Sequence, residues 1–254
     1  MGVSARRGKY EIWTDRCPGW HTHRMHRYGQ YCPVAKAAEV LGERWTLLIV
    51  RDVMEGAHRF TDLHAGLPGL SRTVLTQRLR LLEREGVIER REGSGGRGEY
   101  WLTTVGQDLQ PALFAIGEWA SRNYAREPKR DELDPTVLML WIQRHVRRDR
   151  LPRGRAVFRF EFHGARPPRA WLLIEEGVPS VCREDPGFDC DLVIWTDLVT
   201  LNRVFTGRVA LSATLRDGSV RLEGAAAHAR TFPRWFGLSP FAPATRERLG
   251  VAAV

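Results

Sequence analysis

A charged segment with a proline near each end, residues 126–135, divides the chain into two parts with different hydrophobic patterns. Before it, apolar residues recur three or four positions apart, as in amphipathic helices; after it, some runs alternate apolar and polar residues, as in half-buried strands. The 254 residues suffice for two ordinary domains. The predicted divisions are a tail over 1–30, a first domain over 31–126, a linker over 127–135, a second domain over 136–242 and a tail over 243–254.

The first domain has the element order of a winged helix-turn-helix. Apolar spacing predicts helices over residues 33–41, 44–55 and 60–65, and Ser71 is placed to cap a longer helix that runs to about residue 85. Strands are predicted over 87–91 and 99–102, on either side of a glycine-rich hairpin loop. Thr104 and Gln107 have the form of a capping box at the start of a last long helix.

The helix predicted over residues 71–85 has two chemically different faces. Leu75, Leu79 and Leu82 form an apolar stripe, while arginine, glutamine and threonine lie opposite. Such side chains hydrogen-bond to base edges and phosphates of DNA, although an ordinary solvated face has the same pattern. The tight turn before the helix and the arginine-bearing hairpin after it favour DNA binding. The predicted DNA-contacting residues are Arg72, Thr73, Thr76, Gln77, Arg80, Arg84 and Arg97.

Charge and composition leave the partner open. The chain has 39 Lys and Arg against 30 Asp and Glu, a net charge of +9, which fits a polyanionic partner but also an arginine-rich solvated surface. No apolar run has the length of a membrane-spanning helix, and no secretion signal is evident. Four scattered cysteines do not form a disulfide framework, so a reducing cytoplasm is expected.

The first domain resembles the HxlR family of bacterial winged-helix regulators. The resemblance lies in Cys-Pro-Val (32–34), Arg-Trp-Thr (44–46), Arg-Phe-x-Asp-Leu (59–63), Ser-x-x-x-Leu-x-x-Arg-Leu (71–79) and Tyr-x-Leu-Thr (100–103). It implies a homodimer that binds a pseudopalindromic DNA operator, with one recognition helix of each subunit in a major groove, and that represses or activates transcription. It also implies that the N-terminal helix and the helix over 104–123 build the dimer interface.

The second domain is predicted to be α+β with a mainly antiparallel sheet. Helices are expected over 136–148, 197–205 and 225–235. Residues 156–162 alternate strictly, with three phenylalanines on one face, which predicts a half-buried strand. The further predicted strands are 170–174, 178–183, 191–196 and 220–223.

Parts of the second domain resemble sterol-carrier-protein-2-like (SCP2-like) domains, in residues 155–164, 170–177, 191–209 and 217–232. The resemblance implies a five-stranded sheet covered by helices around an apolar cavity that takes a lipid or another hydrophobic molecule. Aromatic residues in a sheet also form ordinary core, and that alternative stays open. The candidate ligand-binding residues are Trp141, Phe158, Phe160, Trp171, Val193, Trp195, Leu201, Phe205 and Trp235.

Cys32 is a candidate redox sensor. Some HxlR relatives use the cysteine of the Cys-Pro-Val motif as a thiol sensor, and a cysteine at a helix N-terminus can have a stabilised thiolate. The alternative is a small buried apolar residue near the dimer interface. Cys32 and the residues Cys17, His21, His23 and His26 lack a recognised zinc-ligand spacing, so no metal is expected.

Three functions follow from these patterns. The first is an operator-binding homodimer that responds to a hydrophobic small molecule in the second domain. The second is a regulator switched through Cys32, and the third is a lipid carrier or enzyme accessory module. The sequence contains no nucleophile elbow, phosphate-binding loop or zinc-protease motif, so we expect no enzymatic activity and no cofactor. No membrane partner is expected.

Overall fold

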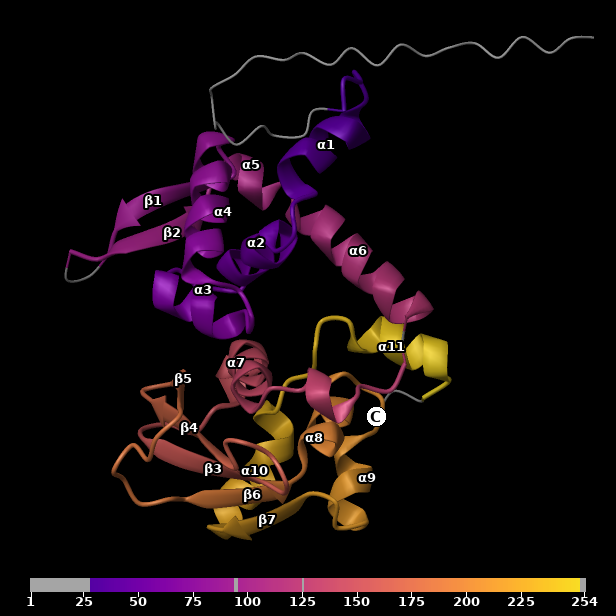
Figure 1. The fold of residues 1–254 in the computed structure, drawn as a ribbon. Coiled ribbons are helices and arrows are strands. Elements are labelled where there is room, and N and C mark those ends of the chain that lie inside the picture. The colour runs from indigo at the N-terminus through magenta and orange to yellow at the C-terminus, as the bar shows by residue number, and fades with distance from the viewer. Residues whose placement is uncertain (1–27, 94–95, 125, 252–254) are drawn as a thin grey trace, which may run out of the picture.

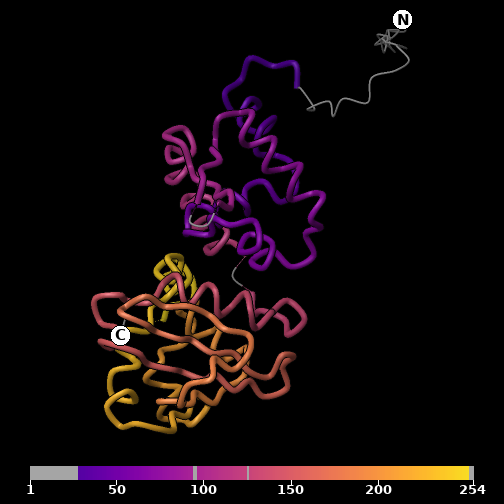
Figure 2. Tube along the Cα trace, turned by 90° about the vertical axis from the view of Figure 1, so that its left-hand side faces the viewer, coloured from indigo at the N-terminus to yellow at the C-terminus, as the bar shows by residue number. Residues whose placement is uncertain are grey.

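The computed structural model describes residues 28–93, 96–124 and 126–251, and it is α+β as expected. The residues before the linker form a helical unit with a two-stranded sheet, and those after it form a unit around a five-stranded sheet. Figures 1 and 2 show the first unit stacked on the second, with helix α7 and the C-terminal segment at the junction. None of the helices within the described ranges has both the length and the apolar character that a membrane crossing requires.

The first unit is a winged helix-turn-helix. Buried apolar side chains of its second to fourth helices, among them Ile49, Leu63 and Leu79, form its core. Ser71 caps the fourth helix as predicted, because its hydroxyl accepts a hydrogen bond from the amide of Val74 at 3.2 Å. The elements are α1 (Pro33–Leu41), α2 (Thr46–Met54), α3 (Phe60–Gly66), α4 (Arg72–Arg84) and the antiparallel strands β1 (Ile88–Glu92) and β2 (Gly98–Leu102).

The predicted capping box at Thr104 is wrong by one residue. Thr103 is the N-cap, and its hydroxyl accepts a hydrogen bond from the Gly106 amide at 3.1 Å. The helix that follows, α5 (Thr104–Gln107), is one turn long, and the long helix α6 (Gln110–Asn123) begins separately. Pro111 explains the break, since it has no amide hydrogen to donate to the preceding turn.

The second unit contains a five-stranded sheet in the order β5-β4-β3-β6-β7. Strands β3 and β6 are parallel and the other neighbours are antiparallel. Helices α7, α8 and α10 cover one face, where Phe158 and Phe160 contact Phe232 or Trp235. The elements are α7 (Pro135–His145), β3 (Ala156–Phe162), β4 (Arg169–Glu175), β5 (Val178–Cys182), β6 (Leu192–Thr196), α8 (Leu198–Phe205), α9 (Leu211–Arg216), β7 (Arg221–Gly224) and α10 (Ala226–Trp235).

Strand β3 is buried on both faces, not half-buried as its alternating sequence predicts. On the face away from the helices, Val157 packs with Trp171 and Leu173 of β4. Glu161 on that face is only 7% exposed, and it is paired with Arg159 at 3.0 Å and Arg169 at 2.9 Å. Large and charged neighbours therefore cover a face that alternation alone assigns to solvent.

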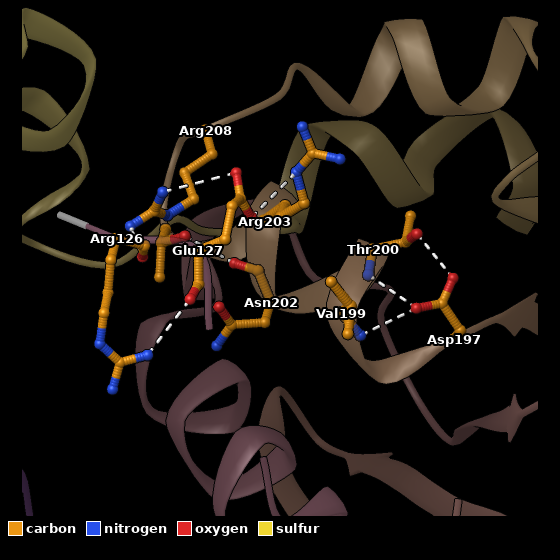
Figure 3. A network of polar contacts seen from close by, with 9 residues as sticks. Arg126, Glu127, Asp197, Val199, Thr200, Asn202, Arg203 and Arg208 are labelled. Atoms are coloured by element: carbon orange, nitrogen blue, oxygen red, sulfur yellow. Dashed lines mark hydrogen bonds and ion pairs between the residues drawn. The ribbon is translucent and has the colours of Figure 1, made fainter. Parts of the chain in front are cut away.

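Ion pairs hold the predicted linker over 127–135 against the second unit (Figure 3). Glu127 is paired with Arg203 and Arg208, in each case at 3.7 Å. Within the linker, a short 3-10 helix, η1 (Arg130–Glu132), ends in a carboxylate that pairs with Arg126. The hydrogen bond from Arg126 lowers the pKa of Glu132 to about 2. The positions of the domain boundaries stay a prediction.

The predicted C-terminal tail over 243–254 contains a packed helix, α11 (Ala242–Leu249). Its first turn lies against α6, where the rings of Phe241 and Phe114 have centroids 5.7 Å apart. Arg122 also pairs with Glu247 at 3.3 Å. The helix is stabilised by contacts with the first unit, which its own weakly periodic sequence does not indicate. Of the predicted N-terminal tail, residues 1–27 lie outside the described residues.

Gly117 lets Phe241 approach α6, and this contact gives a first prediction. A Cβ atom at Gly117 would lie 2.3 Å from the Phe241 ring. In an ordinary helix, Gly→Ala stabilises by roughly 0.5–1 kcal/mol. Here we expect Gly117→Ala to lower the free energy of unfolding by about 1–3 kcal/mol through overpacking, measured by chemical denaturation. Adding Phe241→Leu should recover part of the loss, and stabilisation by Gly117→Ala alone would contradict this packing.

Candidate nucleic-acid interface and interdomain cavities

Helix α4 presents most of the predicted DNA-contacting residues on one surface. Its apolar stripe is buried in the first unit, while Arg72, Thr73, Arg80 and Arg84 are exposed and Gln77 is half-buried. Ser71 caps the helix N-terminus, a position where partial positive charge favours a phosphate. The structure therefore brings together the part of the predicted interface that lies on α4.

Some of these polar side chains on α4 already have a hydrogen-bond or ion-pair partner within the protein, and others have no ion pair within the described ranges. The hydroxyl of Thr76 donates to the carbonyl of Arg72 at 2.9 Å, and Arg84 pairs with Glu85 at 3.2 Å. Among the described residues, Arg72 and Arg80 have no ion-pair partner. The two unpaired guanidinium groups are available for bases or phosphates without first breaking a contact.

Arg97 lies on the hairpin and is exposed, as predicted. Its carbonyl accepts a hydrogen bond from the Gly93 amide at 2.8 Å, which closes the base of the loop. Arg91 instead pairs with Glu89 and lies over the Trp101 ring, 5.2 Å from its centroid. The hairpin therefore offers Arg97 to a partner and uses Arg91 internally.

Arg78 anchors α4, although the sequence analysis does not include it among the predicted DNA-contacting residues. Its guanidinium pairs with Glu43 at 2.7 Å and donates to the carbonyl of Arg44 at 3.3 Å. Both partners precede α2, so Arg78 ties the predicted reading helix to the start of its neighbour. The sequence signals for this role are its position between the polar face and the leucine stripe and its place as the arginine of the motif over 71–79.

A buried ion cluster joins the two units. Asp52 of α2 is fully buried, and its Oδ1 accepts from Arg51 at 2.9 Å and from Arg144 of α7 at 3.3 Å. Both guanidinium groups also lie over the Trp141 ring, at 4.5 Å and 5.6 Å from its centroid. The other carboxylate oxygen, Oδ2, has no hydrogen-bond partner among the described residues. Two arginines therefore share one carboxylate oxygen in this cluster, while Glu55 lies close by in the wall of the neighbouring cavity.

Two cavities lie beside this cluster, on either side of Trp141 and Phe241. The first, about 220 Å³, is almost wholly apolar and lies between α2, α6 and α7; the second, about 300 Å³, lies between the linker, α7 and α8 and has more polar walls. Arg51 lines both. The apolar cavity is lined by Leu47, Leu48, Arg51, Met54, Glu55, Leu113, Phe114, Ile116, Gly117, Trp141 and Phe241.

The structure does not gather the nine candidate ligand-binding residues around one cavity. Trp141 lines both interdomain cavities and Phe205 lines the second. Four others are buried in the core between the sheet and its helices: Phe158, Phe160, Leu201 and Trp235. The remaining three lie on the opposite face of the sheet, because their register places them beside Arg159 or Glu161: Trp171, Val193 and Trp195. The alternation of a strand thus separates residues that the sequence suggested as one set.

Cys32 occupies the N-cap position of α1. The backbone amides of Ala35 and Val34, in the first turn of α1, lower the pKa of its thiol. By contrast, burial raises the pKa of the Cys182 thiol. Of the zinc candidates, Cys17, His21, His23 and His26 lie outside the described residues.

Comparisons with known proteins agree on the first unit. The model of the HxlR-like helix-turn-helix family matches residues 40–128. The HTH-type transcriptional regulator YvaP of Bacillus subtilis (strain 168) is 42% identical over 95 residues, which cover 36% of this chain and 88% of the relative. The HTH-type regulator sll1512 of Synechocystis sp. is 37% identical over 95 residues, which cover 37% of this chain and 70% of the relative.

Among solved structures, the chain is similar to the reduced form of the transcriptional regulator YodB from B. subtilis. The sequence identity is 31%, the match covers 37% of this chain and 95% of the YodB chain, and the TM-score is 0.33. The relatives thus match less than half of this chain, while the chain covers most of the length of YvaP. Through this match and the family model over residues 40–128, the chain belongs to the HxlR-like helix-turn-helix family.

Proposed function

We propose that this protein is a dimeric transcription regulator that reads a pseudopalindromic operator with α4 and the hairpin, and whose DNA binding changes when an apolar small molecule binds between its two units. The observation that carries the proposal is the exposed polar surface of α4, held by Arg78 and by the buried leucine stripe. Relatives such as YvaP and sll1512 are HTH-type transcriptional regulators, which supports it.

Arg80 and Gln77 are the side chains best suited to read bases. Arginine donates two hydrogen bonds to guanine in the major groove, and glutamine both donates to and accepts from adenine. Arg72 and Arg97 lie farther out, on the first residue of α4 and on the hairpin, where they suit phosphates. We therefore assign DNA sequence specificity to the middle of α4, and sequence-independent DNA affinity to the first residue of α4 and to the hairpin.

This assignment predicts that substitution of either base-reading side chain reduces the sequence specificity of DNA binding. Arg80→Ala and Gln77→Ala should each reduce discrimination between the operator and unrelated DNA by roughly 1–3 kcal/mol for each half-site, about 5- to 150-fold for each half-site, while the fold is kept. Fluorescence anisotropy with DNA from the regulator's own promoter measures this. Arg234→Ala, an exposed arginine on α10, is the control. Unchanged discrimination in both variants would remove α4 as the reading element.

Exposed apolar side chains on α1 and α6 support the proposal that the protein forms a dimer through these helices. Val34 on α1 is 76% exposed, and Ile116 and Trp119 on α6 are 48% and 55% exposed. These helices lie on the side of the first unit away from the hairpin (Figure 1). Large exposed apolar side chains are frequent at protein interfaces, so we place the second subunit against α1 and α6 and leave both reading helices free.

The effector site that we propose is the pair of interdomain cavities. The apolar one suits a small aromatic body, and Arg51 at the wall shared by both suits a polar or anionic substituent. The second unit supplies Trp141 and Phe241 to these walls. We propose that this unit is an SCP2-like domain, which is supported by a five-stranded sheet with helices packed on one face. A ligand there contacts both units, so it acts allosterically if it binds one arrangement of them more tightly.

Trp141 tests the effector site. The probe is 1-anilinonaphthalene-8-sulfonate, an aromatic anion whose fluorescence rises in apolar surroundings. We expect Trp141→Ala to weaken its binding at least tenfold, and Leu113→Phe, which narrows the apolar cavity, to weaken it as well. Trp195→Ala, on the opposite face of the sheet and outside both cavities, serves as the matched control. If Trp141→Ala and Leu113→Phe both bind the probe as tightly as the wild type, these cavities are excluded as the effector site.

A second candidate function, a thiol switch at Cys32, is favoured by the lowered pKa of its thiol. The thiolate is the nucleophile, and a lowered pKa increases its fraction at neutral pH. Cys32 precedes α1, which belongs to the proposed dimer interface. Oxidation there would therefore act on the spacing of the two reading helices.

The pKa of Cys32 predicts a pH-dependent reactivity. In a variant that keeps only Cys32, the rate of alkylation by iodoacetamide should rise with pH to a midpoint below about 8.5, the value of an ordinary thiol. A variant that keeps only Cys182 should have its midpoint above that value, because burial raises its pKa. A switch also requires that diamide alter operator binding in the wild type and not in Cys32→Ser; the same response in both would refute it.

A further inference from the structure

A third cavity, about 630 Å³, opens between the two units on the side of α3 and α4. Its walls come from the ends of α2 and α3, from the first residue of α4, and from α7 and β5. Unlike the other two cavities it is lined largely by polar groups, among them four arginines: Arg72, Arg144, Arg148 and Arg183. We call it the arginine cleft.

The arginine cleft has an excess of unpaired positive charge. Arg144 is engaged by Asp52, but Arg72, Arg148 and Arg183 are exposed and have no ion-pair partner among the described residues. Against its four arginines, the cleft has two carboxylates in its walls. Glu55 lies 3.4 Å from His145, and Asp62 accepts a hydrogen bond from the Thr61 hydroxyl at 3.2 Å. The cleft is therefore suited to an anion.

Arg72 connects this cleft to the DNA-reading surface. It is the first residue of α4, a helix of 13 residues whose N-terminus carries partial positive charge, and it lines the cleft together with Arg148 and Arg183. A nucleic-acid strand that passes the start of α4 thus comes to the mouth of the cleft. The two other arginines belong to the second unit. Arg148 begins a short 3-10 helix, η2 (Arg148–Arg150), that follows α7, and Arg183 lies just after β5.

We propose that Arg148 and Arg183 bind backbone phosphates of the DNA beside the half-site read by α4. The second unit then enlarges the DNA footprint, in addition to holding the effector. This inference rests on the proposed operator binding and adds to it a second, sequence-independent contact. Because α7 lines both the effector cavities and the arginine cleft, a ligand that shifts α7 would alter these phosphate contacts directly.

The salt dependence of DNA binding tests the proposal in the full-length protein. Removal of one phosphate-binding side chain lowers the slope of log K against log salt concentration by about 0.9. Because each substitution is present in both subunits of the dimer, Arg148→Ala and Arg183→Ala should each lower the slope by roughly 1.8, and each should weaken operator and unrelated duplex DNA by the same factor. Arg148→Lys should keep most of the slope. Arg216→Ala, on α9, is the matched control.

The outcomes separate this inference from the proposed function. If Arg80→Ala loses discrimination while Arg148→Ala and Arg183→Ala keep the wild-type slope, operator reading stands and the phosphate contact is refuted. If the wild type binds no DNA, both fail. A free phosphorylated ligand is the alternative occupant, probed with inorganic pyrophosphate by calorimetry. Pyrophosphate binding that depends on Arg183, together with an unchanged DNA slope in Arg183→Ala, would overturn the assignment to DNA.

Discussion

The carboxylate of Asp52 is the interaction on which the arrangement of the two units depends. It is fully buried in α2, and one of its two guanidinium partners, Arg144, comes from α7 of the other unit. Removing one partner from a buried ion pair typically costs about 3–5 kcal/mol, because a charge is left without compensation. Gly66 makes room for this contact, since a Cβ atom there would lie 2.7 Å from Oδ2 of Asp52. The reading unit is therefore anchored to its neighbour rather than loosely tethered.

This anchoring determines where ligands can act. Trp141 lies under both arginines of the cluster and forms the shared wall of the two interdomain cavities, while Arg144 also lines the arginine cleft. The proposed effector and DNA sites thus lie on different sides of one helix, α7. A displacement of α7 would change both the effector site and the DNA site. Packed helices move as stiff bodies, and the buried ion cluster resists separation of the two units.

Local patterns predicted the elements of the reading unit closely, including the Ser71 cap and the polar surface of α4. These features depend on side chains a few residues apart, so they can be seen in the sequence. The burial of β3 on both faces could not be predicted in the same way. It depends on Trp171, Leu173 and Arg169, which are neighbours only after β4 has paired with β3.

By itself, the sequence determined most elements of the reading unit, the family and the residues that α4 presents to solvent. Periodicity and capping are short-range properties, and the family motifs lie in one contiguous stretch. The tertiary structure alone decided that residues 242–249 form a helix against α6, that the candidate ligand residues lie on two faces of a sheet, and that cavities form between the units. The helix and the cavities depend on long-range packing around Asp52 and Phe241, and the two faces depend on the pairing of β3 with β4 and β6. In each case contacts between residues far apart in the chain outweigh local preference.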